Sequence, residues 1–269
     1  INHEGYLGNA KPYGFFILGG NMKKFILFIF TLFTLAAAAV GCTSRNNDVE
    51  KTEQILTMAI GDEPEQGFDP IYGWGRYGSP LIQSTLVETN AKMEIVNDLS
   101  SEYKISDDGK TWTFKIRSDA YFTDGTRVTA KDVAFTYNKT KESKSRVDLT
   151  VMDSVKAIDE NTVEFKLSYP QSAFIYNVAK IGIVPEHAYG SGYGDKPIGS
   201  GPFKFVQWDK GQQLILEANE KYYGTIPKIK KVAILFMSED AAMVAAKAGK
   251  LDVAMTVPSM ADVKIDGMK

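Results

Sequence analysis

The chain has 269 residues, of which 44% are hydrophobic and 24% charged, and its formal net charge is −2. Residues 1–42 hold three lysines and one glutamate, which leaves 28 basic and 32 acidic residues in the rest of the chain. No run of basic residues with interleaved aromatics occurs, which argues against nucleic acid as a partner. The 227 residues after position 42 are enough for one large domain or two smaller ones.

The only cysteine follows a pattern that is typical of an export signal. Two lysines come after Met22, and an almost unbroken apolar run extends over 25–40. The sequence "AVGC" resembles a lipobox, in which the cysteine thiol takes a diacylglyceryl group. We therefore expect 22–41 to be a lipoprotein signal peptide and Cys42 to be the lipidated mature N-terminus. The alternative is an uncleaved anchor helix, although a bilayer span needs about 20 residues.

Two further segments near the N-terminus are not expected to belong to the fold. Residues 1–21 begin with Ile and precede the signal pattern, so we interpret them as a translated upstream leader. Residues 42–52 are mostly polar and predict a flexible tether between the lipid and the folded part. Lipidation would also explain why the chain has a single cysteine, without a redox role for it.

The folded part is expected to begin with a buried strand at 55–60, which is a short apolar run. A stretch rich in glycine and proline follows over 61–80 and predicts a long irregular loop, a kind of loop that is often functional. Residues 81–88 predict a short helix.

A β-hairpin is predicted over 102–117, turning at the Asp-Asp-Gly sequence 107–109. Its second strand alternates apolar and polar residues, which indicates one buried and one solvent-exposed face. A helix is then expected to start at Thr129, with Asp132 completing a capping box. The charged stretch 139–146 is interpreted as a solvated helix end.

The second half of the chain predicts alternating hairpins and helices. Residues 154–168 read as a hairpin and 173–180 as a short helix, and the glycine-dense segment 189–203 marks a crossing between structural units. Two strands at 203–208 and 213–218 lead to a fully buried strand at 231–237. A helix over 240–248, stopped by Gly249, and a strand at 252–256 complete a βαβ unit.

Catalytic and cofactor motifs are absent from the sequence. Of the two histidines, His3 lies in the expected leader and His187 stands alone, which predicts a structural role and no metal site. Glycines 190, 192 and 194 superficially resemble a phosphate loop, but no strand leads into them and no GK[ST] follows. No HExxH, GxSxG, SxxK or CxxC occurs, so an enzyme is disfavoured and no cofactor is expected.

Three separated stretches resemble one protein family. Residues 98–137, beginning "DLSSEYKISDDGKTWTF", resemble the signature region of the family 5 extracellular solute-binding proteins, the peptide/nickel-type binding components of ABC importers. Residues 197–237, beginning "PIGSGPFKFVQW", and "AGKLDVA" at 248–254 resemble two further segments, in the same order. Tyr223 stands where the family commonly has Trp.

The resemblance implies an α/β fold, with a periplasmic-binding-protein-like (type II) lobe and an additional α+β subdomain. By analogy, 53–78 with 198–257 would form the first binding lobe and 79–197 the extra subdomain. Family members are longer and have a second lobe joined by a hinge. We therefore expect that this lobe is missing here and that 258–269 is a truncated end.

The function implied by the resemblance is solute capture outside the cytoplasmic membrane. Two lobes would close on an oligopeptide or dipeptide and present it to a membrane permease, with ATP hydrolysis on partner subunits. The lipid anchor would hold the protein at the cell membrane or in the periplasm and raise its effective concentration near the permease.

The loop after the first strand is the expected source of ligand contacts. Tyr72, Trp74 and Tyr77 would offer flat apolar contact with a polar tip, and Arg76 could grip a carboxylate. Trp74 could instead only pack the loop down. Lys180, after the short helix, is a further candidate.

The sequence leaves the ligand open. Peptide, bound through its backbone in extended form, is the first choice. A nickel or other metal chelate is the alternative within the family, because a metal that arrives with its own small carboxylate ligand needs few protein histidines. A lipid-anchored hydrolase and a structural surface lipoprotein are alternatives of other classes.

Overall fold

The computed structural model describes residues 55–254 except 79 and 144. The predictions for 1–21, 22–41, 42–52 and 258–269, which include Cys42, lie outside the described residues. Within the described part, none of the helices has the length and apolar character to cross a membrane.

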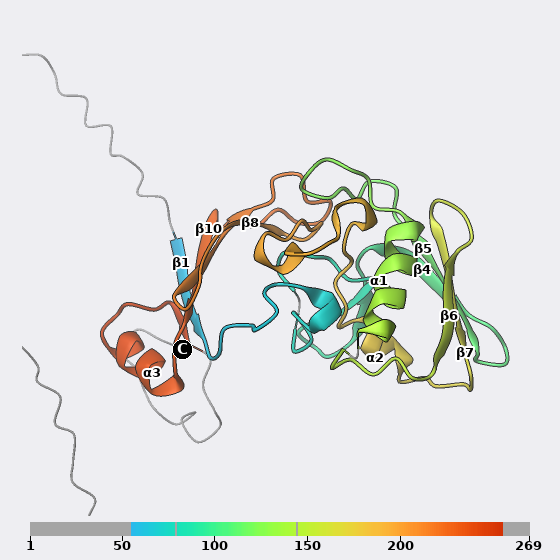
Figure 1. Ribbon diagram of the computed structural model, residues 1–269, viewed down its shortest axis with the longest axis horizontal. Helices are drawn as coiled ribbons and strands as arrows, with labels where there is room; N and C mark the ends of the chain where they lie inside the picture. Colours follow the sequence, from blue (N-terminus) through green and yellow to red (C-terminus); the bar gives the residue numbers. More distant parts are fainter. Residues whose placement is uncertain (1–54, 79, 144, 255–269) are drawn as a thin grey trace, which may run out of the picture. The chain divides into compact units, whose positions relative to one another are not determined.

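A five-stranded mixed sheet contains the first strand of the described chain, in the order β11-β1-β10-β9-β8 (Figure 1). Its strands are β1 (Ile55–Ile60), β8 (Phe203–Asp209), β9 (Gln213–Ala218), β10 (Lys231–Phe236) and β11 (Val253–Ala254). Strand β1 lies between β10 and β11 and runs parallel to both, and β9 is antiparallel to β10. The five strands predicted here are confirmed, and β11 is described only as far as residue 254.

Helix α3 (Glu239–Lys247) connects β10 to β11 and confirms the predicted βαβ unit. Ser238 caps its N-terminus by accepting a hydrogen bond from the amide of Ala241 at 3.3 Å. Gly249 follows the helix with φ +67°, a conformation that glycine adopts without steric cost. Small side chains on one face of α3, Ala242 and Ala246, pack against Ala59 of β1.

A second, antiparallel sheet has the order β4-β5-β7-β6. Its strands are β4 (Ser100–Ile105), β5 (Thr111–Ile116), β6 (Met152–Ala157) and β7 (Thr162–Leu167). Helices α1 (Ala130–Glu142) and α2 (Phe174–Val178) cover one of its faces (Figure 1). The alternation predicted for β5 is confirmed, since Trp112, Phe114 and Ile116 are buried in the core beneath the helices.

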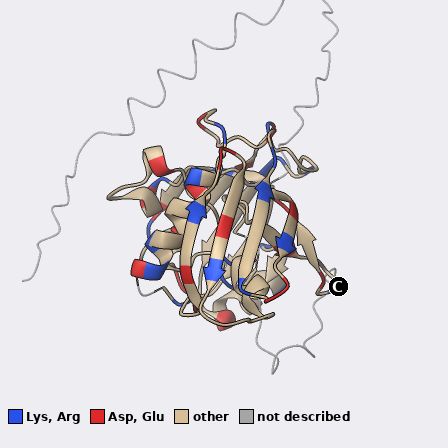
Figure 2. Cartoon of the chain, turned by 90° about the vertical axis from the view of Figure 1, so that its right-hand side faces the viewer, with Lys and Arg blue, Asp and Glu red and all other residues tan. Residues whose placement is uncertain are grey.

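The other face of this sheet is open to solvent and carries charges of both signs (Figure 2). Lys115 of β5 and Glu164 of β7 lie on it, as does Lys104 of β4. Mixed charge of this kind is typical of a solvated sheet face. Because successive side chains of a strand point to opposite faces, the apolar residues of this sheet face the core and the charged residues face solvent.

The helix predicted at 81–88 is wrong. These residues form turns that lead into β2 (Val87–Thr89), which pairs with β3 (Ile95–Asn97). Tertiary contacts take the backbone groups that a helix would use: the carbonyl of Leu81 accepts from Phe203 at 3.0 Å, and that of Ile82 accepts from Gly201 at 2.8 Å. A Cβ at Gly199 would lie 2.0 Å from the Ile82 oxygen, so the glycines of this crossing allow the two segments to meet.

Within residues 55–254, three short 3₁₀ helices lie in the connections. They are η1 (Pro70–Tyr72), η2 (Glu186–Ala188) and η3 (Tyr193–Asp195). Helix η1 belongs to the long loop after β1, and η3 lies in the glycine-dense segment. The carbonyl of Gly194 accepts a hydrogen bond from the amide of Phe68 at 2.9 Å, which holds these two segments together.

Candidate ligand-binding site

The carboxyl ends of β1 and β10 lie at one edge of the five-stranded sheet because the two strands are parallel. The turn between β8 and β9 lies at the same edge: the carbonyl of Gln212 accepts from Phe236 at 2.9 Å. Glu63, just after β1, accepts from the amide of Gly211 at 2.7 Å and from the indole of Trp208 at 2.6 Å. In open α/β sheets, ligands bind in the crevice outside the carboxyl ends of the strands.

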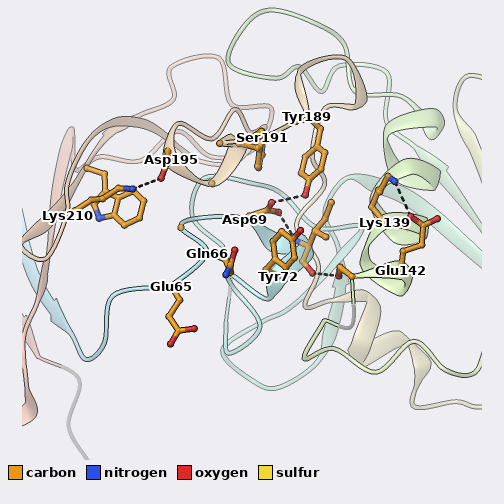
Figure 3. A pocket seen from close by; sticks show the side chains of 18 residues that line it. Glu65, Gln66, Asp69, Tyr72, Lys139, Glu142, Tyr189, Ser191, Asp195 and Lys210 are labelled. Carbon is orange, nitrogen blue, oxygen red and sulfur yellow. Dashed lines mark hydrogen bonds and ion pairs between the residues drawn. The ribbon is translucent and has the colours of Figure 1, made fainter.

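A pocket of about 660 Å³ opens at this edge (Figure 3). Four segments line it: the loop after β1 from Glu65 to Tyr72, the end of α1, the segment 189–195, and the β8–β9 hairpin. We call it the Asp69 pocket, after the acidic residue that it contains. Its volume lies within the range of small-molecule sites, which is roughly 300–1,000 Å³.

Asp69 lies at the middle of the pocket and is only 3% exposed. One carboxylate oxygen accepts from the amide of Ile71 at 2.9 Å and so caps η1, and the other accepts from the hydroxyl of Tyr189 at 2.9 Å. Burial raises the pKa of Asp69, although both hydrogen bonds oppose the shift. Burial also raises the pKa of Tyr189, with the neighbouring Asp69 charge as the second cause.

Two ion pairs flank Asp69 on opposite sides in Figure 3. Lys139 and Glu142 of α1 form one at 3.0 Å, and Lys210 and Asp195 form the other at 3.0 Å. The ammonium of Lys210 also lies 4.7 Å from the ring centre of Trp208, a cation–π distance. Both lysines of the pocket therefore have a carboxylate partner.

Of the five residues predicted to contact ligand, only Tyr72 lines the pocket, where it is 46% exposed. The side chain of Trp74 packs on the core beneath the loop, with its ring centre 4.9 Å from that of Phe68. Arg76 donates to the carbonyl of Gly73 at 3.1 Å and to the hydroxyl of Tyr77 at 3.0 Å.

Tyr77 and Lys180 lie elsewhere on the surface. Tyr77 is 88% exposed, and the guanidinium of Arg76 lies over its ring at 4.2 Å. Lys180 is exposed just after α2 and is not part of the pocket lining. The structure therefore does not bring the five candidates together in one site.

The pocket residues that the sequence did not reveal come from segments far apart in the chain. Asp69 and Tyr189, both of which line the pocket, are 120 positions apart in the chain. The sequence indicated the loop after β1 as a source of ligand contacts, but the glycine-dense segment 189–203 was interpreted only as a crossing between structural units. Among the described residues, no group of three or more His, Cys, Asp and Glu is arranged to hold a metal ion.

A second polar cluster joins the segment after β3 to the segment after β9. Asp98 accepts hydrogen bonds from the hydroxyl of Tyr223 and from the amide of Thr85, the latter at 3.0 Å. The guanidinium of Arg117 lies 4.2 Å from the ring centre of Tyr223 and forms an ion pair with Asp119 at 2.7 Å. The cluster lies outside the pocket and connects the two large sheets.

Comparison with known proteins gives consistent results. The model of the bacterial extracellular solute-binding proteins, family 5, middle region, matches residues 94–267. The probable D,D-dipeptide-binding periplasmic protein DdpA of Escherichia coli is 34% identical over 191 residues, which cover 66% of this chain and 37% of that protein. The oligopeptide-binding protein AppA of Bacillus subtilis is 29% identical over 257 residues, which cover 83% of this chain and 45% of that protein.

Solved structures agree with these relatives. NikZ from Campylobacter jejuni, in complex with Ni(L-His), superposes with a TM-score of 0.70 at 29% identity, covering 77% of this chain and 44% of that one. AppA from Bacillus subtilis, in complex with a nonapeptide, gives 0.64 at 28% identity, covering 74% and 43%. The chain thus spans less than half the length of these proteins.

The α/β fold of the periplasmic-binding-protein type II class, expected from the sequence, is confirmed by these neighbours. The family match extends over well more than half of the chain. The chain belongs to family 5 of the bacterial extracellular solute-binding proteins.

Proposed function

We propose that the protein is the substrate-binding component of an ABC importer, which captures oligopeptide or dipeptide outside the cytoplasmic membrane and delivers it to the permease. The observation that carries the proposal is the Asp69 pocket, because it opens at the carboxyl edge of the sheet in a chain of this family. Relatives named as dipeptide- or oligopeptide-binding proteins support the choice of ligand.

The division of the chain into structural units follows the strands. We assign 53–78 and 198–257 to the first binding lobe, because the strands of the five-stranded sheet fall in these ranges. We assign 79–197 to the extra subdomain, which then holds the four-stranded sheet and its two helices. In a protein with the length of the relatives, a second lobe would close over the carboxyl edge of the first and exclude water from the ligand.

Peptide is favoured over a nickel chelate. NikZ with Ni(L-His) is among the structural neighbours, but relatives and neighbours named for peptides include DdpA and AppA. The pocket combines aromatic rings with carboxylate, ammonium and backbone groups, which suit a peptide. No catalytic motif is present in the sequence, so we propose that the ligand is bound without chemical change.

The location of the protein is proposed from its sequence. We expect lipidation of Cys42 to hold the protein at the outer surface of the cytoplasmic membrane, or in the periplasm, within reach of the permease. Replacing this residue by serine, Cys42→Ser, should move the protein from the membrane fraction to the soluble fraction. A Cys42→Ser protein that stays with the membrane would contradict the lipid anchor.

The function is tested by native mass spectrometry of the full-length protein, purified without denaturation. A co-purified mass that fragments as a peptide is the expected result. A nickel ion with a small organic acid would replace peptide by the metal-chelate alternative. Peptide cleavage that is lost on a single Asp or Glu substitution would instead indicate a hydrolase and overturn the proposal.

A further inference from the structure

The four-stranded sheet has an edge strand on each side, β4 and β6, and β6 is protected by its neighbours. Two side chains of α1 reach backbone carbonyls of β6: Lys141 donates to that of Asp153 at 3.2 Å, and Asn138 donates to that of Val155 at 3.5 Å. Helix α1 also packs over β6 and β7. An edge that is covered in this way offers few free backbone groups to another strand.

Strand β4 lacks this protection over most of its length. The amide of Ser106 donates to the carbonyl of Thr111 at 2.9 Å, and alternate residues of an antiparallel strand share this direction. The backbone groups of Tyr103 and Ile105 therefore point away from β5. Within the described residues, the side-chain hydrogen bond to a carbonyl of β4 is at Ser101, near the start of the strand, and none reaches Tyr103 or Ile105.

The side chains at this edge are apolar on the face that holds the core. Tyr103 lies opposite Phe114, with the two ring centres 5.4 Å apart, but it is still 36% exposed. Ile105 lies opposite Trp112 and is 45% exposed. The apolar layer of the sheet thus continues to the edge of β4 and is open to solvent there. A further strand placed beside β4 would extend this layer and cover both side chains.

The other face of β4 carries one charge of each sign. Glu102 and Lys104 are two positions apart, so their side chains lie on the same face of the strand. Neither forms an ion pair within the part of the chain that the structure describes. Charged residues on an edge strand discourage pairing with strands that offer no matching charge. A partner strand for β4 must therefore carry the opposite charges in the reverse order.

Strand β4 itself meets this requirement. When two copies of β4 run antiparallel with Tyr103 on the twofold axis, Glu102 of each copy faces Lys104 of the other. The outward-facing backbone groups of Tyr103 then pair with those of the second Tyr103, as in a regular antiparallel ladder. A twofold contact of this kind uses the same surface on both copies and is closed, so it does not grow into a fibre.

We propose that β4 is a homodimer interface, at which a second copy of this protein adds its own β4 and joins the two four-stranded sheets into one. The free backbone of Tyr103 supplies the hydrogen bonds, and Tyr103 and Ile105 supply apolar contact. The two pairs of Glu102 with Lys104 set the register, since opposite charges directly across an antiparallel pair are favourable and like charges are not. The interface lies outside the Asp69 pocket and does not depend on the ligand.

Sedimentation velocity of the full-length protein tests the proposal. The protein is measured from about 1 to 500 µM, because a single strand edge buries less surface than a standard interface and associates weakly. We expect a shift from monomer to dimer within this range. A wild-type protein that stays monomeric throughout would overturn the proposal and leave the proposed function unaffected.

Charge reversal locates the dimer at β4 and fixes its register. Glu102→Lys alone, or Lys104→Glu alone, places like charges across both pairs, and each should weaken the dimer at least about tenfold. An equal mixture of the two variants restores opposite charges and should dimerise again as a mixed pair. Both positions are exposed, so the fold should tolerate these changes.

The matched control is Lys156→Glu, the same change of charge at an exposed position of the opposite edge strand β6. It should dimerise like the wild type. Dimers of unchanged strength in both single variants would show that another surface is used. Equal weakening by the control, or a mixture that stays monomeric, would contradict the pairing of Glu102 with Lys104.

Discussion

Tyr223 donates its hydroxyl hydrogen bond to the carboxylate of Asp98, across 125 positions of sequence. Tyr223 lies in the connection between β9 and β10 of the five-stranded sheet, and Asp98 lies just before β4 of the four-stranded sheet. The ring of Tyr223 is in turn covered by the guanidinium of Arg117. This contact ties the two sheets together through a side chain that can change its charge.

The stability of the fold should therefore depend on pH through Asp98. Burial raises the pKa of Asp98 from 3.8 to about 6, against the opposing hydrogen bonds from Tyr223 and Thr85. Since the folded pKa lies above the unfolded one, the protonated form stabilises the fold. This contribution is complete below pH 4 and is lost as the pH rises through 6, by about 3 kcal/mol at most.

Urea unfolding at pH 4 and pH 7 measures this effect, with Asp98→Asn as the non-titrating reference. The difference in unfolding free energy between wild type and variant should shift with pH in favour of the variant as the pH rises. Parallel pH profiles for the two proteins would show that Asp98 does not titrate in this range.

Replacing Gly194 by alanine should destabilise the fold, whereas the same substitution at Gly190, four positions earlier, should be tolerated. A Cβ at Gly194 would lie 2.3 Å from the carbonyl oxygen of Gln66, whereas a Cβ at Gly190 would meet no atom within 4 Å. Gly194→Ala should thus separate the segment from the loop that carries Asp69 and cost roughly 1–3 kcal/mol. Thermal unfolding of both alanine variants checks this, and equal melting temperatures would contradict it.

The periodic parts of the fold were predictable from the sequence because their causes are local. Strand β5 alternates buried and exposed residues, and α3 ends at a glycine with positive φ. The helix predicted at 81–88 is wrong for the opposite reason, since the carbonyls of Leu81 and Ile82 accept hydrogen bonds from Phe203 and Gly201, more than 110 positions away. No local pattern carries that information.

The pocket was predictable only in part, for a similar reason. Its location after β1 followed from the length and composition of the loop, and Tyr72 was among the predicted residues. Asp69 had no local signal as a pocket residue, because its burial depends on Tyr189 and on the close approach of Gly67 to Gly194. The sequence also could not show which aromatic side chain of the loop packs on the core. Trp74 does so, because its ring packs against that of Phe68.

Substitutions of Trp74 and Tyr77 should separate packing from ligand contact in this loop. Trp74 packs on the core with Phe68, so Trp74→Ala should lower the unfolding free energy by about 2–4 kcal/mol. Tyr77 is 88% exposed, and Tyr77→Ala should change it by less than about 0.5 kcal/mol. Chemical denaturation gives both values. A Trp74→Ala variant with an unchanged unfolding free energy would show that the indole does not stabilise the fold.

Asp132 should stabilise the fold by more than its role in the capping box of α1 would give. Its Oδ2 accepts from the amide and hydroxyl of Thr129 at 2.9 and 2.8 Å, as the sequence predicts, while its Oδ1 accepts from the amide of Glu186 at 3.0 Å. Because Asp132 is buried, Asp132→Ala leaves donors from two segments unpaired and should cost about 2–3 kcal/mol. Thr129→Ala removes only one hydroxyl and should cost about 1 kcal/mol. Urea unfolding of the two variants checks this difference, and equal losses would show that the bond to Glu186 adds nothing to the cap.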